Sequence, residues 1–347
     1  MAKKLSKQVS LGYDPVTGKR IRRWIHADTK TGLKQEEKKA IAEYARNGAP
    51  SSIKYKDFEK LWFETYKSNL EPQTKKVYKS ALKAAIPLHN KKLKDITRSE
   101  LQLTVNTFWD KPDQCYLYVQ QIRNMWNVAV GDGICQKNVT LGLKLPKRTR
   151  KPRRPLTKEE LTAISKAKFD PLERFMVDVL LQFGLRPGEA LALSKQSFNR
   201  KARTLTIDKA LAHDSNQPFI KTTKTGVTRV LPVPDSFWKK IPNTNTLYYF
   251  VEEDGQLMRQ HNVWKFSSGI IKKINAAMGG NNKLKLTDMT LYNFRHHKAS
   301  ILYYLPGVSL KKKAEYMGHS ESMFIKTYSH MMEEKEDVEA LRSAVNL

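Results

Sequence analysis

The sequence predicts a mainly α-helical protein with small β elements, an α+β chain of several domains. Apolar residues recur with a helical period through residues 53–145 and again through most of residues 156–330. Alternating segments typical of strands are short, and they are confined to residues 8–26 and 204–233. A chain of 347 residues with 40% hydrophobic residues can fill two or three cores.

The charge balance indicates a polyanionic partner. Lysine and arginine number 63 against 34 aspartates and glutamates, which gives a net charge of +29 distributed along the whole chain. No apolar run approaches the ~18 residues of a membrane-spanning helix, and the N-terminus lacks the apolar core of a signal peptide, so we expect a cytoplasmic protein. The two cysteines, Cys115 and Cys135, predict neither a disulfide framework nor a zinc site.

Residues 1–50 are predicted to form a small DNA-binding domain. Residues 8–13 and 19–26 alternate like two strands around a turn at 14–18, and a helix should follow from about residue 34 to residue 47. The second strand displays four cations, Lys19, Arg20, Arg22 and Arg23. Such a density suits contact with phosphates along a groove, although a charged strand edge that prevents pairing explains it equally well.

Residues 51–145 are predicted to form a compact domain of four helices, the third of which opens with the capping box Thr97-x-x-Glu100. The apolar stripes that should form its core are Phe58, Leu61, Trp62, Thr65 and Tyr66, then Val77, Tyr78, Ala81, Leu82 and Ala85, and finally Tyr118, Ile122, Met125, Trp126 and Ala129. The polar faces carry Lys75, Lys76 and Lys79. These lysines either solvate the domain or contact a DNA backbone.

Residues 146–155 are predicted to form a basic linker. Six cations and three prolines within this segment favour an extended, exposed conformation. Its candidate DNA contacts are Lys147, Arg148, Arg150 and Lys151. The composition also fits a nuclear-localisation signal, but a basic strap between two basic domains fits a protein that wraps around a duplex.

Residues 156–347 are predicted to form the second large domain. An apolar helix over 175–183 breaks before Arg186, and Glu189 follows three residues later, where it can hold the arginine rigid. Strands are expected at about 204–208, 217–223 and 228–233, and the last two should pair as a hairpin with Lys224 at its tip.

The last part of this domain carries a candidate nucleophile. After a helix at about 262–278, the pattern Tyr292-x-x-Arg295 opens another helix, and a third ends at Gly318 so that His319 lies just past the helix end. A short helix then leads to Tyr328. A tyrosine hydroxyl, with an ordinary pKa near 10, attacks a phosphodiester at neutral pH only with help from neighbouring cations.

Five fragments, taken in order, resemble those of tyrosine recombinases of the phage and mobile-element integrase type. They are Gly184-Leu185-Arg186-Pro187-Gly188-Glu189, the segment Lys-Thr-Gly-Val-Thr-Arg-Val-Leu-Pro that begins at Lys224, Tyr292-Asn293-Phe294-Arg295-His296, Met317-Gly318-His319 and Tyr328-Ser329-His330. Each fragment is weak alone, but five in the right order form a specific joint signal. The resemblance implies an arm-type DNA-binding domain over 1–50, a helical core-binding domain over 51–145 and a mixed α/β catalytic domain over 156–347.

The resemblance also implies a chemical role for each site residue. Tyr328 would attack the scissile phosphate to form a 3′-phosphotyrosyl link, and Arg186 and Arg295 would clamp the non-bridging oxygens. His319 would add a hydrogen bond, and Lys224 would protonate the leaving 5′-oxygen. Neither a metal nor a nucleotide cofactor is implied.

Tyr292 departs from the family pattern, which usually has histidine three residues before the second arginine. A phenol can donate a hydrogen bond to a phosphate oxygen, but it cannot act as a base near neutral pH. We therefore expect reduced dependence on this position rather than inactivity.

The partners implied by the resemblance are double-stranded DNA, at core and arm sites, and further copies of the chain. Exchange between two duplexes needs a homo-tetramer on DNA, whereas the free protein is expected to be a monomer associated with the nucleoid. A tail helix over 336–347 would dock on a neighbouring protomer or on its own domain. Excision factors and host DNA-bending factors are further candidate partners.

Two other functions explain part of the sequence. A type IB topoisomerase shares the chemistry but has no use for an arm-type domain. A non-catalytic DNA-binding regulator explains the charge but not the ordered set of two arginines, Lys224, His319 and Tyr328. Covalent attachment of Tyr328 to nicked DNA separates an enzyme from a regulator.

Overall fold

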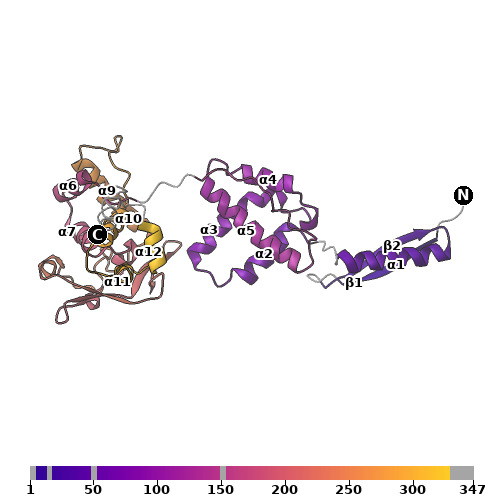
Figure 1. Ribbon diagram of the computed structural model, residues 1–347, viewed down its shortest axis with the longest axis horizontal. Helices are drawn as coiled ribbons and strands as arrows, with labels where there is room; N and C mark the ends of the chain where they lie inside the picture. The colour runs from indigo at the N-terminus through magenta and orange to yellow at the C-terminus, as the bar shows by residue number, and fades with distance from the viewer. Residues whose placement is uncertain (1–4, 14–17, 48–52, 149–153, 329–347) are drawn as a thin grey trace, which may run out of the picture. The chain divides into compact units, whose positions relative to one another are not determined.

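The computed structural model describes residues 5–13, 18–47, 53–148 and 154–328, which belong to two compact units, Met1–Arg150 and Lys151–Leu347. Helices dominate both units and the sheets are small, so the predicted α+β class is confirmed (Figure 1). The unit boundary falls inside the predicted linker at 146–155. Within the described ranges, no helix is both long and apolar enough to cross a membrane.

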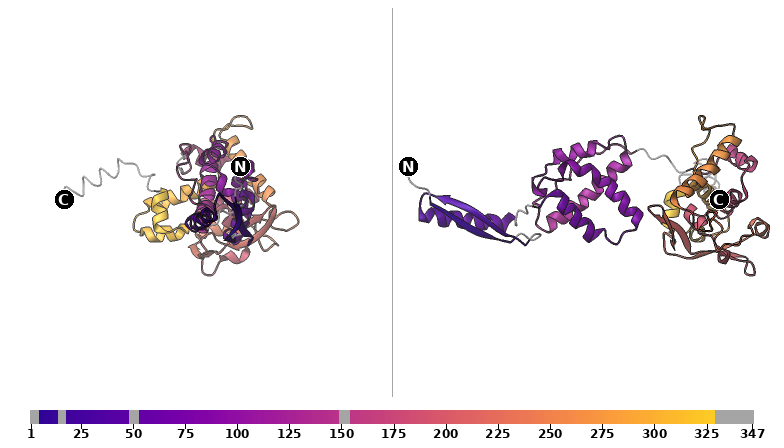
Figure 2. Two further views of the ribbon diagram at one scale, coloured as in Figure 1. Left: turned by 90° about the vertical axis from the view of Figure 1, so that its right-hand side faces the viewer. Right: turned by 180° about the vertical axis from the view of Figure 1, so that it is seen from behind.

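The N-terminal elements are a two-stranded antiparallel sheet and one helix. Strands β1 (Leu5–Tyr13) and β2 (Arg20–Ala27) pair with a bulge between Ser10 and Gly12, and helix α1 (Lys30–Asn47) lies along the sheet (Figure 2). The helix begins earlier than predicted because the Thr29 side chain accepts the Gly32 N–H at 3.0 Å and so caps its first turn. The turn at 14–17 lies outside the described residues.

Four α-helices form the next part of the first unit, as predicted for residues 51–145. They are α2 (Tyr55–Tyr66), α3 (Pro72–Leu82), α4 (Arg98–Asn106) and α5 (Pro112–Gly131), with 3₁₀ turns η1 (Lys83–Leu88) and η2 (Leu93–Asp95) between α3 and α4. Both hydrogen bonds of the predicted capping box between Thr97 and Glu100 are present. Cys115 and Cys135 are buried free thiols.

The predicted apolar stripes of α2 and α3 were too wide. Leu61, Tyr66 and Val77 are exposed, whereas Phe58 and Trp62 are buried. The reason is that α5 fills the centre of this core, with all five residues of its predicted stripe buried. Each shorter helix therefore contributes only a narrow face to the core.

The second unit contains all the remaining helices and strands of the described residues. They are α6 (Lys158–Lys166), α7 (Pro171–Phe183), α8 (Pro187–Leu191), η3 (Lys195–Ser197), β3 (Phe198–Asn199), β4 (Thr204–Ile207), β5 (Lys209–Asp214), β6 (Gln217–Thr222), β7 (Arg229–Pro232), η4 (Asp235–Lys240), α9 (Gln260–Ala277), α10 (Leu291–Tyr304), α11 (Leu310–Met317) and α12 (Glu321–Tyr328). Phe175, Phe183, Phe250 and Phe294 are fully buried in its main core. The predicted tail helix at 336–347 lies outside the described residues.

The predicted hairpin between residues 217–223 and 228–233 was wrong. Strand β6 pairs with β5, while β7 pairs with β4 in a separate sheet of order β3-β4-β7. Lys224 therefore lies in the connection between two sheets rather than at a hairpin tip. Strand β5 escaped prediction because its sequence, Lys-Ala-Leu-Ala-His-Asp, has few of the β-branched and aromatic residues that mark strands.

A half-buried acid, Glu59, lies in the four-helix part. The Tyr55 ring stacks on His89 with ring centroids 5.8 Å apart, and Glu59 Oε2 lies 3.7 Å from His89 Nε2. Burial raises the pKa of Glu59 to about 7, while burial and the charge of Lys56 lower the pKa of His89. Near neutral pH the two groups therefore tend to be a neutral pair rather than an ion pair.

This arrangement predicts a pH-dependent stability. Because the folded-state pKa of Glu59 is raised, its stabilising contribution is complete below the unfolded-state pKa near 4.5 and is lost as the pH rises through about 7. Glu59→Gln, which imitates the protonated side chain, should therefore stabilise this part more at pH 8 than at pH 5, by up to about 3 kcal/mol. Amide hydrogen exchange of α5 in the full chain measures the difference. Glu64→Gln, at an exposed position of α2, is the control, and an equal effect of Glu59→Gln at both pH values would contradict the assignment.

Candidate active site

Two helix ends in the second unit hold the arginines predicted to bind phosphate. Helices α7 and α11 end at Gly184 and Gly318, which both adopt the left-handed conformation with φ of 63°. Arg295 Nη1 donates to the Gly184 carbonyl at 2.9 Å, and its Nη2 donates to the Met317 carbonyl. Arg186 Nη2 donates to the Gly318 carbonyl at 3.0 Å. Carbonyls at helix C-termini carry partial negative charge, so both guanidinium groups are held by dipoles as well as by geometry.

Glu189 is the carboxylate that fixes Arg186, as the sequence predicted. Its Oε1 accepts Arg186 Nη1 at 2.7 Å, and its Oε2 accepts the Arg186 backbone N–H at 2.9 Å. Sequence reasoning missed a second guanidinium, that of Arg229 on β7, which donates to the same two oxygens at 3.2 and 2.7 Å. Burial alone would raise the pKa of Glu189, but the hydrogen bonds and charges of the two arginines lower it to about 2. The carboxylate therefore stays ionised.

Arg295 is buried, with 2% of its surface exposed. Burial and the charge of Arg186 lower its pKa to about 10, so it still carries its charge at neutral pH. Its Nη2 lies 2.9 Å from His319 Nε2. Because a guanidinium has only donors, Nε2 must accept, which requires a neutral imidazole with its proton on Nδ1.

Tyr328 packs into the same cluster, at the C-terminal end of α12. Its ring stacks on His319 with centroids 6.0 Å apart and contacts Phe324 at 5.0 Å, and only 1% of the residue is exposed. The hydroxyl lies 3.3 Å from His296 Nδ1. A bulky phosphodiester cannot reach an oxygen covered in this way, so an attack by this oxygen would require α12 to shift.

The two neighbours of Arg295 on α10 differ in their surroundings. Tyr292, one turn earlier, is 51% exposed. His296 is buried against Tyr328, although sequence reasoning gave it no role. Its place directly after Arg295 in a matching motif was the only available signal.

Lys224 lies in a turn beside a groove. It is exposed in a tight turn in which the Gly226 N–H donates to the Thr223 carbonyl at 2.9 Å. The neighbouring Thr225 and Val227 line a groove of about 710 Å³ that His319 also lines. The turn that bears Lys224 thus borders the same groove as the histidine.

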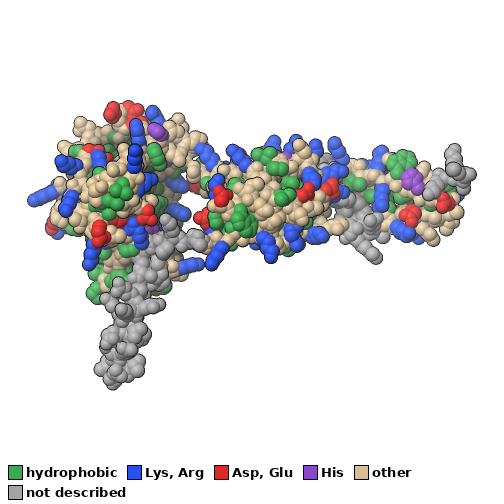
Figure 3. Space-filling view, turned by 90° about the horizontal axis from the view of Figure 1, so that it is seen from above, with side chains coloured by type: hydrophobic (Ala, Val, Ile, Leu, Met, Phe, Trp, Pro, Cys, Tyr) green, Lys and Arg blue, Asp and Glu red, His purple; other side chains and the backbone are tan. Residues whose placement is uncertain are grey.

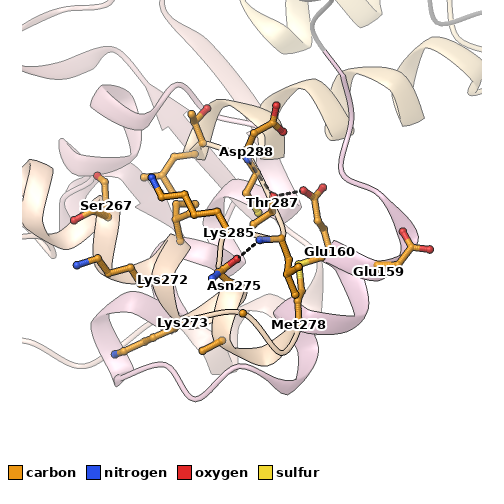
Figure 4. Close-up of a pocket in the computed structure, with 18 of the residues that line it drawn as sticks. Glu159, Glu160, Ser267, Lys272, Lys273, Asn275, Met278, Lys285, Thr287 and Asp288 are labelled. Atoms are coloured by element: carbon orange, nitrogen blue, oxygen red, sulfur yellow. Dashed lines mark hydrogen bonds between the residues drawn. The ribbon is translucent and has the colours of Figure 1, made fainter. Parts of the chain in front are cut away.

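A larger pocket of about 1450 Å³ lies beside α9 (Figure 4). Its wall is fastened by Asn275, whose side chain accepts the Leu286 N–H at 2.7 Å, and by the Thr287 hydroxyl, which donates to Glu160. None of the predicted catalytic residues lines it. Within the described ranges, no group of three or more His, Cys, Asp or Glu side chains could hold a metal ion.

The predicted DNA-contact residues are placed individually, and Figure 3 shows lysine and arginine side chains over the visible face of each unit. The exposed ones are Lys19, Arg20, Arg22, Arg23, Lys76, Lys79 and Lys147. Lys75 is half-buried. Arg150 and Lys151 lie outside the described residues.

Arg148 is not an extended linker residue. It is only partly exposed, because its Nε donates to Asp113 at 2.6 Å and its guanidinium lies 4.8 Å from the centre of the Tyr116 ring. An adjacent acid at the start of α5 thus competes with any external phosphate for this cation.

Comparison with known proteins identifies the class to which this fold and site belong. Residues 155–335 match the model of the phage integrase family, and residues 54–108 match the N-terminal SAM-like domain of phage integrases. The chain therefore belongs to the phage integrase family, which confirms the resemblance seen in the sequence. A probable integrase of prophage ps2 from Lactococcus lactis subsp. lactis (strain IL1403) is 24% identical over 232 residues, which span 60% of each protein.

Solved structures of two integrases share the fold. The Tn1549 transposon integrase in complex with a circular intermediate DNA has a TM-score of 0.69 at 17% identity, covering 84% of this chain and 100% of that one. The lambda integrase tetramer bound to a Holliday junction has a TM-score of 0.61 at 17% identity, covering 89% of this chain and 92% of that one.

The close approach at Gly184 predicts that α10 is sensitive to a single methyl group. A Cβ at this position would lie 2.8 Å from Cβ and Cγ of Lys298, in addition to the strain of a positive φ. Gly184→Ala should therefore lower the free energy of unfolding by about 1–3 kcal/mol more than a substitution that costs only backbone strain. Gly255→Ala is the matched control, since φ there is +77° and the nearest side-chain atom is 3.8 Å away. If urea unfolding shows equal losses of free energy for Gly184→Ala and Gly255→Ala, α10 can move to accommodate the added methyl group.

Proposed function

We propose that this chain is a tyrosine-type site-specific DNA recombinase of a phage or other mobile element. The observation that carries the proposal is the meeting of Arg186, Arg295, His319 and Tyr328, which come from segments far apart in the sequence. Two guanidiniums around one point suit a phosphodiester, because their donors match its two non-bridging oxygens. Membership of the phage integrase family supports the same function.

In the proposed reaction the Tyr328 oxygen attacks the scissile phosphorus, and the bond to the 5′-oxygen breaks. The phosphate becomes esterified to the tyrosine, so the energy of the bond is kept for rejoining. Arg186 and Arg295 stabilise the charge on the non-bridging oxygens, which is the main requirement of phosphoryl transfer. Attack by a 5′-hydroxyl of the partner strand reverses the step and completes the exchange.

Lys224 is proposed as the acid that protonates the leaving 5′-oxygen. Its turn borders the groove that His319 also lines, and the turn leads into β7, whose Arg229 binds Glu189. An exposed lysine on a short connection can enter the site when DNA fills the groove. His319 is proposed to donate to a non-bridging oxygen, and the exposed Tyr292 to have at most a minor part.

The partners proposed are duplex DNA and further copies of the chain. Residues 1–50 are proposed to bind arm-type sites through the exposed cations of β2, and residues 51–145 to bind the core site. A homo-tetramer on DNA is proposed by analogy with the lambda integrase tetramer on a Holliday junction.

Removal of the attacking oxygen tests the proposal directly. Tyr328→Phe should abolish covalent attachment to a nicked duplex cut from the DNA that flanks the gene, because only the nucleophile is lost. Affinity for the intact duplex should change less than threefold, since the buried ring remains. Denaturing electrophoresis measures the adduct. An adduct that persists in the variant, or that maps to Tyr292, would overturn the assignment of Tyr328.

The role of Lys224 is separable from simple phosphate binding. Lys224→Ala should slow cleavage by the ~10² to 10⁴ typical of general acid catalysis while affinity hardly changes. Replacement of the bridging 5′-oxygen by sulfur, a leaving group that needs no proton, should restore the rate towards that of the wild type. Neutralising Lys147, Arg148, Arg150 and Lys151 should instead weaken DNA binding. It should not change the ratio between the cleavage rates of the sulfur-substituted and the normal substrate. An equally deep defect of Lys224→Ala with sulfur would make it a phosphate contact.

A further inference from the structure

Arg229 is a buried arginine to which the reaction described above gives no chemical role. It lies at the start of β7, with 7% of its surface exposed. Both terminal nitrogens bind Glu189, and in the described residues its buried Nε has no hydrogen-bond partner. Leaving a buried donor unpaired costs stability. Neutralising Glu189 alone would not require an arginine with a buried, unpaired Nε–H.

Arg229 shares its carboxylate with Arg186. Glu189 Oε1 accepts from Nη1 of both arginines, and Glu189 Oε2 accepts from Arg229 Nη2 and from the Arg186 backbone. The position of the Arg186 guanidinium is therefore fixed by a carboxylate that is itself fixed by Arg229. Removal of Arg229 would leave Glu189 held from one side only, by the Nη1 and the backbone N–H of Arg186.

Arg229 also supports the chain just before His319. A Cβ on Gly318 would lie 3.1 Å from Arg229 Nη1 and 3.6 Å from Arg186 Nη1, so both guanidiniums lie directly against this backbone. Arg229 and His319 line the same groove. Since Arg229 follows Lys224 by five residues, one side chain connects the Lys224 turn, Glu189 and the end of α11.

We propose that Arg229 is a positioning residue of the strand-transfer reaction, which holds Glu189 and the Gly318 backbone so that Arg186 and His319 face the scissile phosphate. The inference rests on the function proposed above. Arg229 does not contact the reacting atoms. Its effect is on the rate of cleavage, not on the strength of DNA binding.

The experiment measures the single-turnover rate of covalent attachment to the nicked flanking-DNA duplex, the affinity for the intact duplex and thermal unfolding, all with the full chain. The variants are Arg229→Gln, Arg229→Lys, Glu189→Gln and the double variant Arg229→Gln/Glu189→Gln. Arg174→Gln is the matched control, because Arg174 and Lys240 share the buried Asp178 on α7 at 2.5 and 3.2 Å, much as two arginines share Glu189. It should lose stability without slowing cleavage.

Arg229→Gln should slow attachment by about 10- to 100-fold, the cost of misplacing a catalytic group by about 1 Å, with affinity within threefold of the wild type. Arg229→Lys should also be slow, because one ammonium cannot donate to both carboxylate oxygens in the fork geometry of a guanidinium. The double variant should be no slower than the slower single variant, since both act through one contact. If Arg229→Gln does not fold, Arg229→Lys carries the same test.

Two results would overturn the inference. A folded Arg229→Gln or Arg229→Lys that cleaves at the wild-type rate shows that Arg229 positions nothing. Losses that multiply in the double variant show that it acts independently of Glu189. If the wild type itself forms no adduct, the proposed function is rejected, and this inference with it. The wild-type control therefore distinguishes failure of the proposed function from failure of this inference.

Discussion

The arrangement of the second unit depends on one problem, the repulsion among three arginines brought close together away from water. Arg186 and Arg229 share one carboxylate, Glu189, and Arg295 lies close by without a carboxylate of its own in the described residues. Such a cluster is unstable unless other groups supply negative charge. The backbone supplies it, because carbonyls at the ends of α7 and α11 accept from Arg186 and Arg295. The compensation is incomplete, and in the proposed reaction the excess of positive charge attracts the scissile phosphate.

Glu189, which is buried, and Glu59, which is half-buried, show how the surroundings decide the charge of the same side chain. Glu189 stays ionised because two guanidiniums donate to its oxygens, whereas burial raises the pKa of Glu59 to about 7 and no cation among the described residues offsets that effect. The first lies where charge is organised for an anion. The second lies in a helical core where charge would cost stability.

Local patterns predicted most of this architecture. The capping boxes, the glycine helix ends and the spacing of Arg186 from Glu189 are interactions between residues three or four apart, and these can be recognised in the sequence. Arg229 and His296 could not be recognised, because their partners lie 40 and 32 residues away. The prediction of the strand pairing was wrong for the same reason, because β7 pairs with β4, and the β5–β6 hairpin lies between them in the sequence.

The burial of Tyr328 has a consequence for how the protein interacts with DNA sequences that are not its recombination sites. Burying an aromatic ring is worth about 2–3 kcal/mol, so a form with the ring exposed would account for only about one molecule in 30 to 150. A random stretch of DNA that binds both forms equally leaves that ratio unchanged. Only a duplex that binds the exposed form better can raise the share of that form. The packing of one side chain would therefore disfavour cleavage at DNA sequences other than the recombination site.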